Sequence, residues 1–202
     1  MKLALVRHGR PDEGNAERPH DPPLHKEGWR QAHAVARLLA GEGITRVASS
    51  PLLRALQTAQ PLAQRLGLPV EEIEGWAEAD RHLDRYVSLE TLRSRGEAEW
   101  QRFLKDPISY LGGDPVAFCV MTVATLDRMI AESGPQAHVA VFTHGLPINI
   151  VLSRVLGLER IAHFQPGYGS ITACARSAPI ASLSSASTRV ATIHGPMIRL
   201  PR

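Results

Sequence analysis

Two histidines and two arginines stand close behind short apolar runs of the sequence. Arg7 and His8 follow the first run, His144 follows a later one, and Arg54 falls in the first turn of an expected helix after another. Planar guanidinium groups bind the oxygens of a phosphoryl group well. A neutral imidazole can attack phosphorus to form a phosphohistidine, and a protonated imidazole can hold the oxygens as charge spreads in the transition state. These residue types indicate phosphoryl-transfer chemistry.

The combination carries more weight than any one of these residues. A His-Gly pair is common by itself, since His194 with Gly195 also follows an apolar run. We favour His144 because a helix is expected directly after it, and the N-terminus of a helix directs N–H donors at an anion. His194 leads instead into Pro196.

The elements that must position these residues follow from the spacing of the apolar residues. Short apolar runs predict strands, and apolar positions that recur every three to four residues predict amphipathic helices. The predicted strands are 2–6, 44–48, 69–73, 138–142, 170–175 and 189–194, and the predicted helices are 27–39, 51–66, 116–130 and 146–156. The second helix should begin with a serine cap and Pro51 in its first turn, and bend or break near Pro61.

Strands that alternate with helices predict an α/β fold, a three-layer sandwich with a mostly parallel central sheet and helices on both faces. The highly charged, mostly helical stretch at about 74–115 is interpreted as a cap inserted into a single domain of residues 1–202. Ligands of such sheets bind outside the carboxyl ends of the strands. The arginines and histidines should therefore meet at one edge of the sheet.

Composition argues against several other classes of protein. A hydrophobic content of 44%, a charged content of 21% and a net charge of +3 are typical of a soluble globular domain. No apolar run approaches the roughly 18 to 20 residues of a membrane span or the about 7 to 15 residues of a secretory signal core, so we expect a cytoplasmic protein without a membrane anchor. The arginines are spread out rather than clustered, which disfavours nucleic-acid binding. The sequence contains no recognisable metal-ligand motif, and its two cysteines are interpreted as reduced thiols.

Four segments resemble the histidine phosphatase superfamily, also called the phosphoglycerate mutase-like family. They are LVRHG at 5–9, PLHKEGWRQA at 23–32, SSPLLRALQTA at 49–59 and FTHG at 142–145. The third is the most specific, and all four occur in the order and approximate spacing of the family. The expected strands and helices between them also agree with the family over nearly the whole chain.

The resemblance implies a role for each matching residue. His8 would be the phosphorylated nucleophile, and Arg7, Arg54 and His144 would form the phosphate pocket. The family also uses a carboxylic acid to protonate the leaving oxygen, and Glu78, placed after the third predicted strand, is our candidate, with Asp80 as the alternative. Burial beside a phosphate would raise the pKa of such a carboxyl group and keep it protonated near neutral pH.

Departures from the family pattern bear on the substrate. Pro11 replaces the usual hydroxyl residue after the first histidine, and Asn15, our further candidate for binding the substrate, falls one residue late. The segment 81–86 replaces a glycine-rich, acidic motif. Arg81, with the neighbouring His82, Arg85 and Tyr86, either binds a second anionic group of the substrate or lies on a solvated helix face. Tyr168 and Ser170 are weaker candidates for substrate contact.

The hypothesis that follows is a metal-independent phosphatase of the histidine acid phosphatase type, which hydrolyses a small phosphomonoester through a phosphohistidine on His8 without a cofactor. Two alternatives remain. A phosphoglycerate mutase would share the first step, but the Glu-Arg-His-Tyr stretch of such mutases is absent after Glu78. A non-catalytic module that binds a phosphorylated ligand would use the same pocket without turnover. The sequence leaves open both the substrate and whether the chain forms a homodimer.

Overall fold

The computed structural model describes residues 1–158, 161, 164–176 and 188–193. In this part of the chain, six strands form one sheet in the order β3-β2-β4-β1-β5-β6. Neighbouring strands are parallel from β3 to β1, whereas β5 runs antiparallel to β1 and β6 antiparallel to β5. The strands are β1 (Lys2–Arg7), β2 (Arg46–Ser49), β3 (Val70–Glu72), β4 (His138–Thr143), β5 (Ile171–Arg176) and β6 (Thr188–Ile193).

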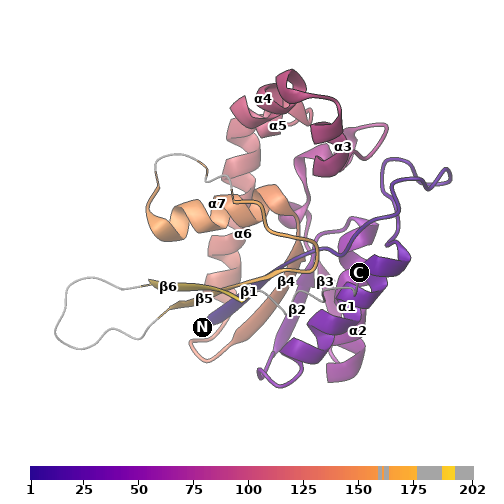
Figure 1. The fold of residues 1–202 in the computed structure, drawn as a ribbon. Coiled ribbons are helices and arrows are strands. Elements are labelled where there is room, and N and C mark those ends of the chain that lie inside the picture. The colour runs from indigo at the N-terminus through magenta and orange to yellow at the C-terminus, as the bar shows by residue number, and fades with distance from the viewer. Residues whose placement is uncertain (159–160, 162–163, 177–187, 194–202) are drawn as a thin grey trace.

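Helices cover both faces of the sheet, which confirms the predicted three-layer α/β fold (Figure 1). Residues of the central strand β1 alternate between the two faces, as a strand's period of two requires. Ala4 and Val6 pack against α1 and α2, and Leu3 and Leu5 pack in the cluster formed with α6 and α7. These four helices are α1 (Lys26–Leu39), α2 (Leu53–Leu66), α6 (Pro115–Glu132) and α7 (Gly145–Leu156).

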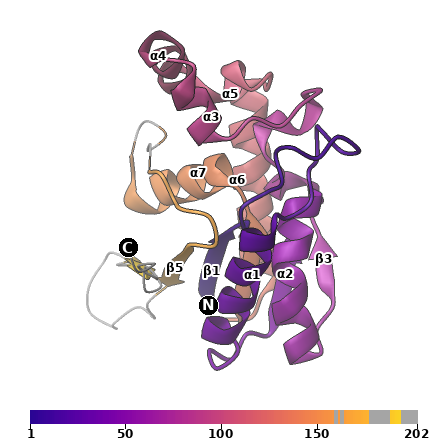
Figure 2. The same ribbon diagram turned by 45° about the vertical axis from the view of Figure 1, so that its right-hand side comes forward.

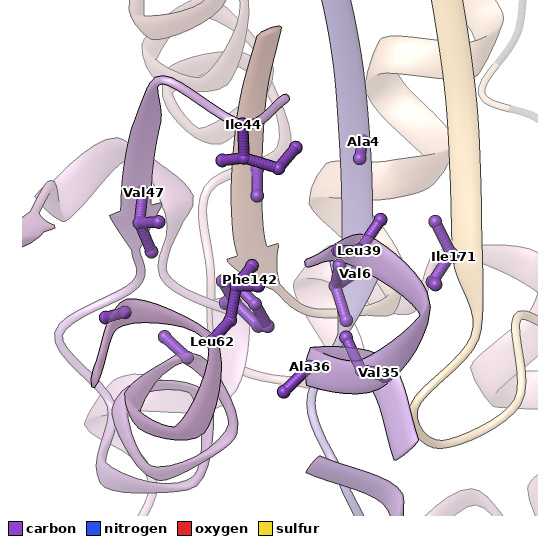
Figure 3. Close-up of a cluster of buried hydrophobic side chains, with 13 residues drawn as sticks. Ala4, Val6, Val35, Ala36, Leu39, Ile44, Val47, Leu62, Phe142 and Ile171 are labelled. Carbon is purple, nitrogen blue, oxygen red and sulfur yellow. The ribbon is translucent and has the colours of Figure 1, made fainter. Parts of the chain in front are cut away.

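The core between the sheet and the helices α1 and α2 explains the spacing of the apolar residues in α1 (Figure 3). Val35, Ala36 and Leu39 lie at helical spacing on one face of α1 and meet Val6 of β1. Phe142 of β4 lies beside them toward α2. Both layers contribute large and small apolar side chains to this cluster, and such mixed sizes let the layers interdigitate closely.

The segment between β3 and α6 lies beyond one end of α6 and α7 (Figures 1 and 2). It contains the 3₁₀ turns η1 (Glu74–Trp76) and η2 (Ala79–His82) and the helices α3 (Leu89–Ser94), α4 (Glu97–Lys105) and α5 (Pro107–Tyr110). A third apolar cluster joins it to the domain, because Leu92, Trp100 and Phe103 pack with Phe118 of α6 and Leu146 of α7. The segment is thus packed onto the sheet domain through α6 and α7.

Two local expectations differ from the structure. The second helix begins at Leu53 rather than at Pro51, and its first N–H groups are met by other partners: Ser50 Oγ accepts from Leu52 N at 3.2 Å, and Asp21 Oδ1 accepts from Leu53 N at 2.9 Å. The helix also continues through Pro61 without a break. Of the last predicted strand, His194 lies outside the described residues.

Candidate active site

The pairing of β1 with β4 brings two histidines to the same edge of the sheet. Arg7 is in register with Thr143, so the next residues, His8 and His144, leave the two strands side by side. Their ring centroids are 5.0 Å apart. Both side chains are buried, at 2% and 0% exposure. Adjacent parallel strands thus deliver two imidazoles to one buried site.

The backbone around His8 sets which ring nitrogen is free. His8 Nδ1 lies 2.8 Å from the carbonyl oxygen of Gly9. A carbonyl only accepts hydrogen bonds, so Nδ1 carries the proton and Nε2 holds the lone pair. The loop is fixed by His8 N, which donates to Thr143 O at 2.9 Å, and by Gly9 N, which donates to Thr58 Oγ1 at 2.9 Å. His8 is therefore oriented as a nucleophile through Nε2.

The charge state of His8 suits the same role. Burial lowers its pKa well below the ordinary value, and the positive charges of Arg54 and Arg7 lower it further. The imidazole is therefore neutral at pH 7. A neutral ring keeps the lone pair that an attack on phosphorus requires.

Arg7 and Arg54 present donors that the protein leaves without acceptors. Arg54 is fully buried, and its Nη2 donates to both carboxylate oxygens of Asp80, at 2.9 and 3.0 Å. Arg7 Nη1 donates to Pro166 O at 2.5 Å. In contrast, Arg7 Nε and Arg54 Nε and Nη1 are buried without a hydrogen bond. Buried donors without partners are costly, so their convergence indicates a site for an anion.

His144 adds a buried ring nitrogen that has no hydrogen bond within the described part of the protein. Its Nε2 lies 2.7 Å from Ser50 Oγ, whereas its Nδ1 is buried without a hydrogen bond. Burial and the positive charge of Arg54 lower the pKa of His144 well below its ordinary value, so the ring is neutral in the free protein. A bound dianion would favour protonation, because a nearby negative charge stabilises the imidazolium.

Glu78 lies in the same pocket, and its raised pKa lets it keep a proton up to about pH 7. Burial raises its pKa to about 7, and the negative charge of Asp80 acts in the same direction. Its Oε1 accepts from Ala79 N at 3.0 Å, and its Oε2 accepts from Leu146 N at 3.1 Å, in the first turn of α7. Asp80, the alternative candidate, is engaged with Arg54 instead. Of the two carboxyl groups, Glu78 has the properties of a proton donor.

Two tyrosines form a wall of the site. The guanidinium of Arg54 lies 4.7 Å from the ring centroid of Tyr86, and that of Arg7 lies 4.2 Å from the ring centroid of Tyr168. The two hydroxyl groups are 3.2 Å apart. Stacking on an aromatic ring fixes the plane of each guanidinium and hence the direction of its free N–H groups. The sequence groups Tyr86 with Arg81 as a candidate for binding a second anionic group and gives Tyr168 as a weaker candidate, without indicating this role for either.

The family model of the histidine phosphatase superfamily (branch 1) matches residues 3–178. The chain belongs to this superfamily. Its sequence relatives include a probable phosphoglycerate mutase, GpmB, of Proteus mirabilis, 32% identical over 80% of this chain and 78% of that protein. Phosphoserine phosphatase 1 of Hydrogenobacter thermophilus is 25% identical over 79% of this chain and 78% of that protein.

Solved structures of the superfamily share the fold. A phosphoserine phosphatase variant from Entamoeba histolytica, in complex with phosphoserine, has a TM-score of 0.67 at 26% identity and covers 87% of this chain and 91% of its own. A mycobacterial glucosyl-3-phosphoglycerate phosphatase has a TM-score of 0.73 at 22% identity, covering 95% and 97%. Phosphatases among these relatives support phosphatase activity for this member of the superfamily.

Three residues that contact the site were not among the candidate site residues predicted from the sequence. Ser50 and Thr58 both lie within the 49–59 segment that carried the resemblance, so their hydroxyl groups were detectable there. Asp21 was not, because it lies in a loop with no regular pattern. Its Oδ1 is 3.7 Å from Arg54 Nη1, and it also accepts the N–H of Leu53. Asp21 therefore links the start of α2 to the buried arginine.

The structure places Asn15 and Arg81 away from the phosphate end of the pocket. Asn15 Oδ1 accepts from Arg18 N at 2.9 Å within its own loop. Arg81 donates to Glu74 Oε2 at 2.6 Å and to His82 Nε2 at 3.0 Å. Neither residue lines the pocket that contains His8 and Glu78.

The described residues contain no group of three or more His, Cys, Asp or Glu side chains arranged to hold a metal ion. In the same part of the chain, no helix combines the length and apolar character needed to cross a membrane.

Proposed function

We propose that this protein is a metal-independent phosphatase that hydrolyses a small phosphomonoester through a phosphohistidine on His8. The observation that carries the proposal is the convergence, in one pocket, of a free His8 Nε2, buried donors without partners and a protonated carboxyl group. Together these supply a nucleophile, a binding site for the phosphoryl oxygens and a proton for the leaving group. Asn15 and Arg81, our sequence-based candidates, have no part in this scheme.

The reaction would proceed in two steps. His8 Nε2 attacks phosphorus while the bond to the ester oxygen breaks, and the Glu78 proton passes to that oxygen to release the alcohol. Arg7, Arg54 and His144 hold the three non-bridging oxygens as charge builds on them. A water molecule then attacks phosphorus and gives a proton to the Glu78 carboxylate, while the bond from phosphorus to His8 Nε2 breaks and its electron pair returns to that nitrogen. Inorganic phosphate leaves, and both side chains return to their starting states.

A trapping experiment tests this scheme. The wild-type chain, His8→Ala and His33→Ala are incubated with 4-nitrophenyl phosphate and a chelator, and rapidly quenched samples are analysed by mass spectrometry. His33 is an exposed residue of α1 and provides the matched histidine control. We expect turnover and an acid-labile phosphorylated peptide at His8 in the wild type and in His33→Ala, and neither in His8→Ala. Turnover that persists in His8→Ala, or that needs a divalent ion, would overturn the proposal.

The relationship to a probable phosphoglycerate mutase makes phosphoryl transfer between hydroxyl groups the second candidate. A mutase would convert 3-phosphoglycerate to its 2-isomer without releasing phosphate, and it would require a bisphosphorylated primer. Phosphate release from 3-phosphoglycerate or other esters without such a primer favours the phosphatase. Binding of vanadate with no turnover of any ester would instead identify a non-catalytic module.

A further inference from the structure

The pocket that contains His8 and Glu78 extends into an apolar chamber under the cap. Six of its lining side chains come from α3, α4 and the end of the α5 segment: Leu89, Leu92, Trp100, Phe103, Leu104 and Leu111. Leu146 of α7 lines it as well, one residue from the glycine that follows His144. A group esterified to a phosphate held by Arg7 and Arg54 would have this space beside it, since Glu78 and the apolar side chains line one cavity.

Charge is confined to the phosphate end of this cavity. Of the described residues that line it, the charged side chains are Arg7, Arg54, Glu78 and Asp80, all engaged at the phosphate end. Among the described residues, the leaving-group end therefore offers no charged partner beyond this set.

Asn149 and Gln165, two of the uncharged polar side chains of the lining, already form hydrogen bonds within the protein. Asn149 Nδ2 donates to Gly145 O at 2.9 Å and to Phe164 O at 3.0 Å, and its Oδ1 accepts from Phe164 N at 2.8 Å. Gln165 Oε1 accepts from Arg93 Nη2 at 3.0 Å. Asn149 has thus used both of its amide hydrogens on the backbone, and it holds the chain at Phe164 rather than a ligand.

Three arginines of the cap have partners outside the phosphate end of the cavity. Arg81 pairs with Glu74, Arg102 pairs with Glu99 on the exposed side of α4, and Arg93 stacks on Trp100 with its guanidinium 4.5 Å from the ring centroid. None of the three lines the chamber. Because the described lining is mostly apolar, a carboxylate or a set of sugar hydroxyl groups entering it would exchange water for few new partners, which is unfavourable.

We propose that the substrate is a phosphomonoester of an apolar alcohol, with an alkyl or aromatic leaving group that fills this chamber. The inference rests on the proposed phosphatase function and specifies its substrate class. Burying apolar surface against the cap then contributes to binding, at about fourfold in affinity for each methylene group removed from water. Phosphoserine, phosphoglycerates and sugar phosphates would be poor substrates.

A series of n-alkyl phosphates tests the proposal, because its members share nearly the same leaving-group acidity and differ in apolar length. We expect kcat/KM to rise severalfold per added methylene from ethyl to about hexyl phosphate. Phosphoserine, 3-phosphoglycerate and glucose 6-phosphate should fall below propyl phosphate. A flat series, or a polar ester that exceeds hexyl phosphate, would overturn the proposed substrate class while leaving the phosphatase itself intact.

Binding measurements test the apolar substrate class separately from the phosphatase function. Calorimetry with His8→Ala compares hexyl phosphate with phosphoserine without any turnover. If no ester is hydrolysed by the wild type, the proposed function fails, and tighter binding of hexyl phosphate would still support an apolar ligand. Equal or weaker binding of hexyl phosphate would refute the apolar site independently of catalysis.

A variant at the wall of the chamber provides the last control. Leu104 is only half-buried, so Leu104→Asn is compatible with folding, which its melting temperature checks. We expect the ratio of kcat/KM for hexyl over ethyl phosphate to fall about tenfold. Leu38→Asn, which changes an exposed leucine of α1 at 48% exposure, should leave that ratio at its wild-type value. Equal ratios in the two variants would contradict the assignment of the chamber.

Discussion

Replacing Glu78 with glutamine is expected to reduce activity and, at alkaline pH, to relieve a stability cost. The pKa of Glu78 rises from its ordinary 4.5 to about 7 on folding. Because the folded pKa is the higher one, the stability that comes from holding the proton is fully present below pH 4.5 and is lost as the pH rises through 7. At about 1.4 kcal/mol per pKa unit, the loss amounts to roughly 3 kcal/mol.

Glutamine cannot titrate, so Glu78→Gln lacks this loss. Its amide can accept only one of the two N–H groups that the carboxyl group accepts, which costs about 1 to 3 kcal/mol at every pH. The informative quantity is therefore the change with pH. The free energy of unfolding of Glu78→Gln minus that of the wild type should increase by roughly 3 kcal/mol between pH 4.5 and pH 8, because only the wild type loses stability over this range.

Urea denaturation at the two pH values, followed by tryptophan fluorescence, measures this change. Glu72→Gln, at an exposed carboxylate just before the same turn, serves as the control and should show little difference between the two pH values. In parallel, kcat/KM of the wild type should decline above about pH 7, where Glu78 loses its proton. Glu78→Gln should lower kcat/KM by about 10²- to 10⁴-fold for an alkyl phosphate and remove that decline.

The reasoning fails if Glu78→Gln and wild type differ by the same free energy at both pH values. Glu78 would then be ionised in the folded protein at neutral pH and could not protonate a leaving oxygen. A decline in kcat/KM that persists unchanged in a still active Glu78→Gln would lead to the same conclusion. Asp80 would become the next residue to test.

Three further predictions concern the phosphate pocket. Asp80→Asn removes a charge that raises the pKa of Glu78, so the alkaline decline of kcat/KM should move to lower pH; an unmoved decline would refute this coupling. Arg54→Lys loses the planar fork that spans Asp80 and the phosphate site, and kcat/KM should fall about 100-fold, with weaker inhibition by vanadate; equal inhibition would place the anion elsewhere. Gly9→Ala would put a methyl group 2.6 Å from the carbonyl oxygen of Gly28, so it should lower the melting temperature and kcat/KM together, and a variant with wild-type values for both would contradict the close approach.

Much of the fold could be read from local patterns because each pattern has a local cause. The buried strand β1 shows as a continuous apolar run, and α1 shows as apolar positions at helical spacing, since burial on two faces or on one face imposes those periods. The start of α2 was misplaced because its first N–H group is met by Asp21, more than thirty residues earlier in the chain. A partner so distant in sequence leaves no local signal.

In the candidate site, too, some features could be predicted from local sequence and others depend on contacts between distant residues. Arg7, His8, Arg54 and His144 could be grouped from sequence because adjacent parallel strands end at one edge of the sheet. The sequence could not show which carboxyl group stays protonated, since Glu78 and Asp80 are two residues apart in the same turn. The distinction depends on where each side chain points, Asp80 toward Arg54 and Glu78 toward the N–H of Leu146.

The sequence by itself determined the α/β fold, the order of its elements and the candidate residues for phosphoryl transfer, because strand and helix periods and short motifs are local properties of the chain. The tertiary structure decided the tautomer of His8, the protonation of Glu78 and the apolar character of the space beside them. In the sequence, Leu92, Trp100 and Phe103 look like the buried side of ordinary helices. Only the packing of the cap onto α6 and α7 turns part of that apolar surface toward the cavity that contains His8 and Glu78, because the direction of a helix face is set by what the helix packs against.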